Sequence, residues 1–551
     1  MTATGDFVGV LALGPAQTRT LAAHIRKTPG GYAGTFDDVD RQITGVALSG
    51  IVVQGDMLAF TLPVEPPGTF TGKWDPAAGK WVGTWTQGSG PLPLALAPGK
   101  PPPRPTVVGL DGAWDGVLAL PTGPKLHLTL YVRSGAGGTA AWMDSPDQLT
   151  YGLDVQALRR DGDAVSLAMA GLNAAFKGVV EKDGKTLDGT FTQGGGALPL
   201  TFTRRAPGQA GPSLNRPQTP KPPYPYKDED VAFEDAGAHV KLAGTLTLPK
   251  GDGPFPAVVL IAGSGPNTRN EPLLGHQVFL VLADYLTRHG IAVLRYDKRG
   301  TGVSGGDYGK ATTADFADDA EAAAAYLRGR KEIDPRHVGL IGHSEGGLIA
   351  PMVAARDADV AFVVMMAGPG VDGYDILTEQ GRLIAKAMGL TDAMVAQSQA
   401  LREQMFDVVR HEKDPQAAAA KLKAIADAYA DAHGASRAGM EAQAAAVDSD
   451  WFRFFYDYDP APTLAKVHCP VLALIGSKDL QVPADQNLPP IRAALAHNPD
   501  AEVEELPGLN HLFQTATTGS PGEYIQIEET IAPIALETIT GWIVRHAVTA
   551  K

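Results

Sequence analysis

Over the first two hundred residues, apolar and polar side chains alternate in short stretches such as residues 126–132, and glycine or Asp-Gly turns separate these stretches. Alternation with a period of two is typical of antiparallel strands with one buried face. Helical periodicity is missing from this whole region. We therefore predict that the N-terminal part of the chain is all β.

This β-rich region contains the same unit twice. The matching parts are residues 5–13 with 112–120, Asp37 and Asp40 with Asp144 and Asp147, and residues 83–88 with 189–194. A repeat of this length predicts duplicated structural modules. We expect one module over residues 1–97 and a second over 106–205, each a small sandwich or partial barrel, or both closing one joint sheet.

From about Lys227 the pattern changes, and apolar runs of strand length alternate with segments of helical period. This alternation indicates an α/β domain with a mostly parallel sheet covered by helices on both faces. The expected strands are residues 242–248, 257–262, 291–296, 338–341, 360–366, 471–475 and 503–506. The expected helices are residues 276–289, 314–328, 346–355 and 525–546.

Proline and alanine usage marks the connections. A proline-rich run at 98–105 joins the two modules, and a longer one places a semi-rigid linker at 206–227, before an α/β domain over 228–551. Between two expected strands lies an alanine-rich, helix-favouring insertion at about 372–450. An insertion at that point predicts a helical lid over the ends of the strands.

Composition narrows the possible functions. The chain of 551 residues is too long for one core, and its net charge of −14 argues against nucleic acid or anionic membranes as partners. The single cysteine, Cys469, excludes an internal disulfide and a multi-cysteine metal site, and we expect a buried core thiol. The chain shows neither a signal peptide nor an apolar run of membrane-spanning length. On its face it is cytoplasmic, or periplasmic or secreted if a signal has been removed.

The strongest chemical signal is Ser344, which stands between Gly342 and Gly346 where an apolar strand runs into a helix. This G-x-S-x-G pattern is typical of a nucleophile elbow, a sharp turn that exposes the serine hydroxyl. Ser304 fits the same pattern but lies well beyond the end of its strand, in a glycine-rich loop. The strand, turn and helix context therefore selects Ser344, and we expect Ser304 to be a loop serine.

A serine nucleophile needs a histidine base and an acid that orients the histidine. Asp479 follows the expected strand 471–475, and His511 follows the expected strand 503–506. The order Ser344, Asp479, His511, each at the C-terminal edge of a strand, predicts a catalytic triad. Asp485 and Glu505 are the rival acids, and His343 is expected to be a packed elbow residue.

The oxyanion of a tetrahedral intermediate needs backbone N–H donors. The N–H of Glu345, directly after the serine at a helix N-terminus, is one candidate. The loop after the strand 257–262 offers Ser264 or Gly265 as the second, and the sequence does not choose between them.

Four residues are candidates for a substrate pocket. Three roles are open for Arg269: contact with the substrate, fixing of the oxyanion loop, or a structural ion pair. The structural ion pair is the favoured role. Trp451, Phe452 and Phe455 lie between the insertion and the sheet. They line an acyl or aromatic pocket or pack as core.

These motifs resemble the α/β-hydrolase superfamily, and within it bacterial serine esterases that combine a Gly-Ser-Gly-Pro loop, a Gly-His-Ser-Glu-Gly-Gly elbow and an N-terminal β extension. Residues 263–266 and 342–347 carry the first two motifs, and 296–304 and 527–531 also match. The resemblance implies a carboxylesterase that works through an acyl-enzyme, without metal or organic cofactor.

Three functions follow from these residues. The leading one is hydrolysis of short- to medium-chain carboxylic esters as small-molecule substrates. A serine peptidase, amidase or acyl thioesterase uses the same triad, and only the pocket decides. The third is a β-repeat protein that binds a glycan or a partner and has a secondary hydrolase role. We also expect no membrane insertion, and a homo-oligomer through the β modules or the lid is a further possibility.

Overall fold

The computed structural model describes residues 4–14, 17–64, 67–87, 91–101, 104–119, 125–135, 137–148, 150–193 and 195–547. The chain divides into two compact units, Met1–Leu214 and Asn215–Lys551. Each unit is built around apolar cores of its own. No described helix is long and apolar enough to cross a membrane.

The described residues of the first unit form two antiparallel sheets of nine strands each. The first sheet consists of β1 (Gly5–Gly14), β2 (Gln17–Thr28), β3 (Gly31–Asp38), β4 (Ile43–Ala47), β5 (Ser49–Gln54), β6 (Met57–Leu62), β7 (Gly68–Asp75), β8 (Lys80–Thr86) and β9 (Pro91–Pro98). The second consists of β10 (Gly112–Ala119), β11 (Lys125–Gly135), β12 (Gly138–Ser145), β13 (Thr150–Asp154), β14 (Arg159–Asp161), β15 (Ala164–Met169), β16 (Ala174–Val180), β17 (Thr186–Gln193) and β18 (Gly196–Arg204).

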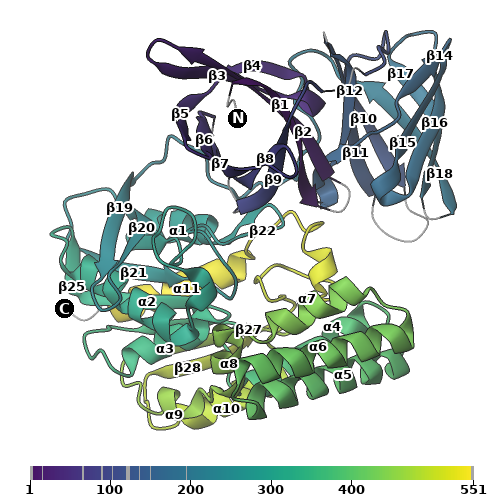
Figure 1. The fold of residues 1–551 in the computed structure, drawn as a ribbon. Coiled ribbons are helices and arrows are strands. Elements are labelled where there is room, and N and C mark those ends of the chain that lie inside the picture. Colours follow the sequence, from purple (N-terminus) through teal and green to yellow (C-terminus); the bar gives the residue numbers. More distant parts are fainter. Residues whose placement is uncertain are drawn as a thin grey trace. The chain divides into compact units, whose positions relative to one another are not determined.

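Both sheets have the same strand order. The first runs β4-β3-β2-β1-β9-β8-β7-β6-β5, and the second runs β13-β12-β11-β10-β18-β17-β16-β15-β14. The first and last strands of each module therefore pair at the centre of the sheet. Figure 1 shows each sheet curling around its own interior, where large aromatic side chains such as Trp81 and Trp114 are fully buried.

The repeated aspartates have equivalent roles in the two modules. Asp37 Oδ1 accepts the N–H of Gly45 at 2.8 Å, and Asp144 Oδ1 accepts the N–H of Gly152 at 2.6 Å. Both glycines have left-handed backbone, with φ of 75° and 73°, a conformation that glycine adopts without a Cβ penalty. The duplication thus preserves a hydrogen bond and the backbone turn that it holds.

The second unit is built on an eight-stranded sheet of order β19-β20-β24-β21-β25-β26-β27-β28. Its strands are β19 (Lys227–Asp235), β20 (Val240–Leu248), β21 (Phe255–Ile261), β24 (Ala292–Tyr296), β25 (Ile333–His343), β26 (Val363–Met366), β27 (Val471–Gly476) and β28 (Ala501–Leu506), and a separate hairpin is made by β22 (Pro272–Leu273) and β23 (His276–Gln277). The pairs from β24 to β28 are parallel, whereas β19 and β20 run antiparallel. The parallel strands β21, β24, β25, β26 and β27 are buried on both faces along their apolar stretches, whereas the edge strand β28 is partly exposed.

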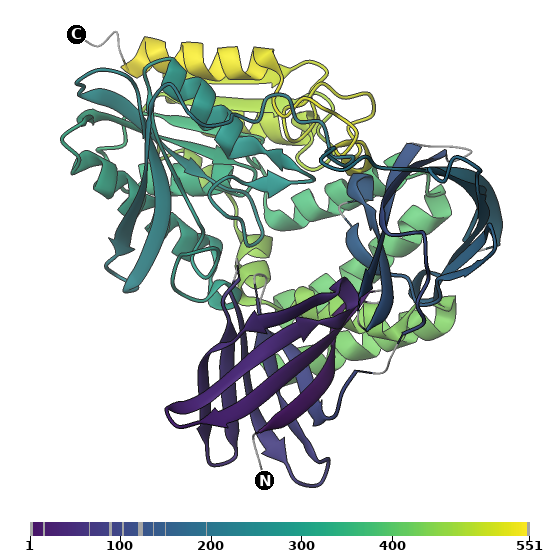
Figure 2. The ribbon, with the colours of Figure 1, turned by 90° about the horizontal axis from the view of Figure 1, so that it is seen from above.

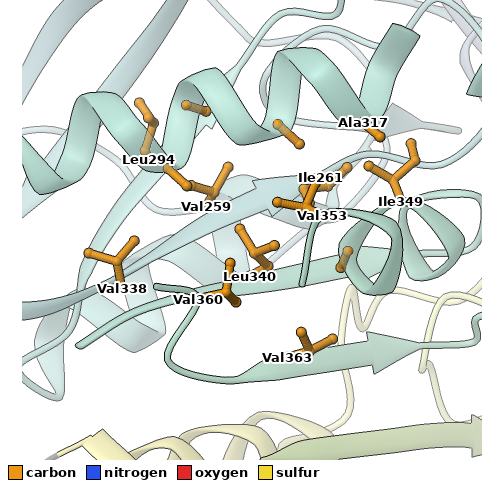
Figure 3. Close-up of a cluster of buried hydrophobic side chains, with 14 of the residues drawn as sticks. Val259, Ile261, Leu294, Ala317, Val338, Leu340, Ile349, Val353, Val360 and Val363 are labelled. Carbon is orange, nitrogen blue, oxygen red and sulfur yellow. The ribbon is translucent and has the colours of Figure 1, made fainter. Parts of the chain in front are cut away.

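Helices cover both faces of this sheet: α1 (Val278–Arg288) and α11 (Pro533–Ala547) on one, and α2 (Thr313–Arg328), α3 (Gly346–Ala354) and α10 (Ala484–Ala494) on the other. Figure 3 shows the core on the second face, where Val259 and Leu340 of the sheet meet Ile349 and Val353 of α3. Burying each such side chain contributes roughly 1.5–3 kcal/mol. This packing fixes the strand ends that carry the candidate site.

The insertion between β26 and β27 is helical, with α4 (Gly373–Ala387), α5 (Asp392–His411), α6 (Pro415–His433), α7 (Arg437–Ala446) and α8 (Asp450–Asp457), followed by the short α9 (Ala461–Leu464). Each helix from α4 to α8 begins after a side chain that accepts a backbone N–H of the first turn: Asp372, Thr391, Asp414, Ser436 and Ser449. Such caps satisfy donors that the helix itself leaves unpaired. Figure 2 shows these helices in green, packed side by side.

The α/β fold class predicted from the sequence is confirmed, and three differences have physical causes. The helix expected at 525–546 begins only at Pro533, because proline is favoured in the first turn of a helix and disfavoured in later turns. Strand β19 was not predicted, because most of its residues are charged and its sequence has no apolar run. It pairs with β20 at the exposed edge of the sheet. Helix α10 was expected only as a helix that Asp485 opens, without bounds, since Pro489 and Pro490 lie inside it. The module, linker and lid boundaries drawn from the sequence stay predictions.

Candidate active site

Ser344 lies in the tight turn between β25 and α3. Its φ is 54°, in the left-handed region that a residue with a Cβ occupies only under strain. The Ser344 N–H donates to the Met366 carbonyl at 2.8 Å. A Cβ at Gly342 would come 1.8 Å from the carbonyl oxygen of Gly346, so the turn requires glycine there. These features are those of a nucleophile elbow.

Asp479 and His511 form a buried hydrogen-bonded pair. Asp479 Oδ2 lies 2.8 Å from His511 Nδ1, and the two side chains are 0% and 5% exposed. Asp479 Oδ1 accepts the backbone N–H groups of Gln481 at 2.8 Å and Val482 at 2.9 Å. The loop after β27 therefore holds the carboxylate, and the carboxylate holds one ring nitrogen of the histidine, which leaves Nε2 for chemistry.

Ser344 and His511 are brought to the same place from distant parts of the chain. The ring of His343, the residue before the serine, lies 4.9 Å from the ring of His511, centroid to centroid. Within the described residues, Ser344 Oγ and His511 Nε2 form no hydrogen bond in this structure. Such catalytic hydrogen bonds are often long in enzymes without substrate and tighten when substrate binds.

A second buried acid and histidine pair supports the first. Glu271 Oε1 lies 3.0 Å from His343 Nδ1, and His343 Nε2 lies 3.0 Å from the carbonyl oxygen of His511. Burial lowers the pKa of His343, but the charge and hydrogen bond of Glu271 outweigh it, so the pKa is raised. Glu271 Oε1 also accepts the N–H of Gly263 at 2.7 Å. One carboxylate thus connects the elbow, the backbone of His511 and the loop after β21.

Glu345, directly after Ser344, is the centre of a buried polar cluster. Its carboxylate accepts Lys298 Nζ at 2.9 Å, Thr313 Oγ1 at 2.7 Å and Trp451 Nε1 at 2.5 Å. Lys298 also donates to the carbonyl of Gly263 at 2.7 Å. Trp451 belongs to α8, so this cluster ties the helical insertion to the elbow.

Two loops offer backbone N–H groups beside the serine. The N–H groups of Glu345 and Ser264 donate to no group among the described residues, whereas that of Gly263 is taken by Glu271. The Gly265 N–H faces the hydroxyl of Tyr308. Burial raises the pKa of Tyr308 to about 12, although the backbone N–H of Gly265 lowers this pKa. A Cβ built at Gly263 would lie 3.1 Å from the Cβ of Ser344, so this loop runs against the nucleophile.

The candidate pocket residues have different surroundings. Arg269 binds the buried Asp297 through Nε and Nη2, at 3.1 and 2.9 Å, which is the structural pairing favoured from the sequence. Trp451 and Phe455 stack at 4.9 Å between ring centroids. Phe452 lines a cavity within the helical insertion. A role for any of them in substrate binding stays a prediction.

The rival residues have structural surroundings. Ser304 Oγ donates to the Asp297 carbonyl at 2.7 Å and accepts the Ala243 N–H at 2.9 Å. Asp485 is exposed in the first turn of α10, and Glu505 is exposed on β28. The expected buried core thiol, Cys469, packs against the core but is only partly buried, because it lies at the entry to β27. Burial still raises its pKa to about 11.

Sequence reasoning did not find Lys298 or His276, which brace the site. His276 Nδ1 lies 2.9 Å from Thr530 Oγ1 and its Nε2 lies 3.0 Å from the Tyr524 carbonyl. The partners are about 250 residues apart in the chain, so no local pattern reveals them. Among the described residues, no three His, Cys, Asp or Glu side chains are placed to hold a metal ion.

The sheet order and the serine at the strained turn define a hydrolase with the α/β-hydrolase fold. A family model described as X-Pro dipeptidyl-peptidase (S15 family) matches residues 236–490, which include Ser344 and Asp479 but not His511. Esterase EstD of Thermotoga maritima is 26% identical over 410 residues, covering 72% of this chain and 90% of that protein.

Solved structures also match this chain. The Pyrococcus furiosus esterase Pf2001 is 17% identical, covering 58% of this chain and 94% of that one, with a TM-score of 0.36. Est1E from Butyrivibrio proteoclasticus, solved with ferulic acid, is 16% identical, covering 57% and 98%, with a TM-score of 0.35.

Proposed function

We propose that this chain is a serine carboxylesterase that hydrolyses short- to medium-chain carboxylic esters through an acyl-enzyme. One observation carries the proposal: a serine at a strained elbow stands beside a histidine that a buried aspartate holds through Nδ1. The similarity to Esterase EstD supports an ester as the substrate. Small-molecule esters are therefore the expected substrates.

In the proposed reaction, Ser344 Oγ attacks the ester carbonyl carbon while His511 Nε2 takes the hydroxyl proton. Asp479 keeps His511 in the tautomer with hydrogen on Nδ1 and stabilises the imidazolium that forms. The tetrahedral intermediate then collapses, and His511 gives its proton to the departing alkoxide. Water repeats the sequence on the acyl-enzyme and releases the carboxylic acid.

The negative oxygen of the intermediate requires N–H donors, each worth about 2.7–4 kcal/mol in the transition state. We assign the first to Glu345, at the N-terminus of α3, where the helix dipole also favours negative charge. Ser264 is the favoured second donor, because its N–H has no partner among the described residues and that of Gly265 faces Tyr308.

Peptide hydrolysis is the second candidate, because the matching family model carries a dipeptidyl-peptidase name. An enzyme that removes N-terminal dipeptides needs a carboxylate for the substrate's ammonium group. Both glutamates beside the serine already hold an internal cation, Glu345 with Lys298 and Glu271 with His343. This pairing favours the ester.

The test compares p-nitrophenyl esters from acetate to palmitate with Gly-Pro-p-nitroanilide, using wild type and Ser344→Ala. We expect ester hydrolysis that peaks at short or medium acyl chains, no anilide cleavage, and loss of activity in the variant. Cleavage of the anilide with inert esters would replace the proposal by the peptidase.

The finer expectations about partners concern the β modules and the insertion. We propose that the β modules or the helical insertion mediate a homo-oligomer, which light scattering tests. We also propose that the β modules bind a glycan or a partner, and a glycan array tests the binding of glycans. Residence in the cytoplasm, or in the periplasm or outside the cell, also stays a prediction.

A further inference from the structure

The helical insertion holds a cavity of about 530 Å³, lined by residues of all five helices from α4 to α8. Its wall is largely apolar and includes Met388, Met405 and Met440. This volume is within the range of small-molecule sites, roughly 300–1,000 Å³. Methionine side chains adapt to ligands of different shape because they are unbranched and polarisable.

One charged side chain, Arg402 of α5, lines this cavity. Its guanidinium lies across the backbone of Gly381 on α4, where a built Cβ would come 1.8 Å from Nη1. A single hydrogen bond is formed within the described residues, from Nη1 to the Leu377 carbonyl at 3.2 Å. Burial lowers the pKa of Arg402, and no carboxylate opposes this effect.

Arg402 differs in this respect from the other described arginines of the insertion. Arg382, Arg410, Arg437 and Arg453 each form an ion pair with an aspartate or glutamate. Arg402 is partly buried, and a guanidinium without a protein counter-ion can form charge-assisted hydrogen bonds with a bound carboxylate. Four of the five N–H donors of Arg402 therefore have no acceptor among the described residues, and they lie beside a largely apolar wall.

We propose that this cavity is a binding site for an apolar carboxylate such as a medium-chain fatty acid. The two carboxylate oxygens accept N–H groups of Arg402, whose planar fork matches them, and the alkyl chain lies among the methionines. At roughly 30 Å³ per water-sized group, a cavity of about 530 Å³ has room for a carboxylate and a chain of roughly ten carbons.

The cavity wall is connected to the loop of the candidate catalytic acid. Gln380, which lines the cavity, donates through Nε2 to Gln481 Oε1 at 3.4 Å. The Gln481 backbone N–H in turn donates to Asp479 Oδ1 at 2.8 Å. Carboxylate binding goes beyond ester hydrolysis and does not depend on it, so a binding measurement tests it even if the proposed reaction fails.

The test is calorimetric titration of the full-length protein with decanoate below its micelle concentration, and with 1-decanol as the uncharged analogue. We expect wild type to bind decanoate, and Arg402→Met to bind it at least tenfold more weakly while its affinity for 1-decanol stays the same. Arg382→Met, on α4 but paired with Glu379, is the matched control and keeps wild-type affinity for decanoate.

A second variant tests the place of binding. Ala385 lines the cavity, and Ala385→Phe fills it, so both ligands lose affinity. Circular dichroism confirms that each variant is folded. Failure of wild type to bind decanoate, equal decanoate affinity in Arg402→Met, or unchanged binding in Ala385→Phe would each overturn the proposal.

Discussion

At the scale of single residues, the candidate site is a set of buried charges with internal partners. Asp479 is held by two backbone amides and by His511, Glu271 by His343, and Glu345 by Lys298. The first pair faces the chemistry and the other two hold its surroundings in place. Removing one partner is therefore expected to affect activity in the first pair and stability in the other two.

We predict that Asp479→Asn lowers kcat on a p-nitrophenyl ester by roughly 10⁴-fold, because the amide favours the wrong tautomer of His511. KM changes little, since the carboxylate does not touch the substrate. Steady-state kinetics measure both constants. Asp485→Asn is the matched control and keeps wild-type kcat. A large loss of kcat in Asp485→Asn, with full activity in Asp479→Asn, would show that Asp485 is the catalytic acid.

A second prediction concerns Lys298, whose side chain is 3% exposed and faces a Glu345 side chain that is 1% exposed. Lys298→Met leaves an uncompensated buried carboxylate and lowers the free energy of unfolding by about 3–5 kcal/mol. The double variant Lys298→Met with Glu345→Gln recovers most of this loss. Urea denaturation followed at 222 nm reports on it, because all described α-helices belong to Asn215–Lys551.

If the double variant were as unstable as Lys298→Met, the loss would come from the packing of the lysine stem and not from the unpaired charge.

At the scale of elements, the sequence predicts strands and contiguous motifs, but not contacts between residues that are far apart in the chain. The parallel strands are apolar runs and the elbow is a contiguous motif, so β21, β24 and β27 were expected within two residues of their bounds. Only the apolar second half of β25 was expected. The pairing of Glu271 with His343 joins residues 72 apart, and no periodicity records it. The cavity beside Arg402 arises only when five helices pack together.

The third prediction belongs to the contact between the β22–β23 hairpin and the C-terminal loops. Burial lowers the pKa of His276 to about 4, below the ordinary value of about 6.5. Between these two values the unfolded chain takes up a proton that the folded protein does not. The free energy of unfolding therefore falls as the pH drops from 6.5 to 4, by up to about 3 kcal/mol from this group.

Urea denaturation of wild type and His276→Gln at pH 7, 5.5 and 4.5 checks this, because the variant lacks the titrating group. The stability advantage of wild type shrinks as the pH falls. His497→Gln, at an exposed position, shows no such trend. A wild-type advantage that is constant from pH 7 to 4.5 would contradict the neutral, buried state of His276.

At the scale of the whole molecule, all residues of the candidate site and their hydrogen-bond partners belong to the Asn215–Lys551 unit. The aligned stretch of Esterase EstD is longer than this unit. The repeat in the first two hundred residues could be predicted from the sequence, because the duplicated segments keep their turns and aspartates. The ligand of the modules could not be predicted, because function depends on particular sites and not on a fold.

We predict that a fragment comprising residues 215–551 keeps kcat/KM on soluble p-nitrophenyl esters within about threefold of the full chain, since the reaction uses no group from the first unit. Kinetics on the folded fragment, verified by circular dichroism, measure this. A folded fragment with less than a tenth of the activity would show that the β modules contribute to catalysis.

The measurement that tests the central claim most directly is mass mapping of the protein after reaction with a p-nitrophenyl phosphonate, which captures an activated serine. The account predicts one equivalent of adduct on Ser344 and none in Ser344→Ala. Adduct on Ser304 or another serine, or no adduct in an active preparation, would contradict the assignment of Ser344 as the nucleophile.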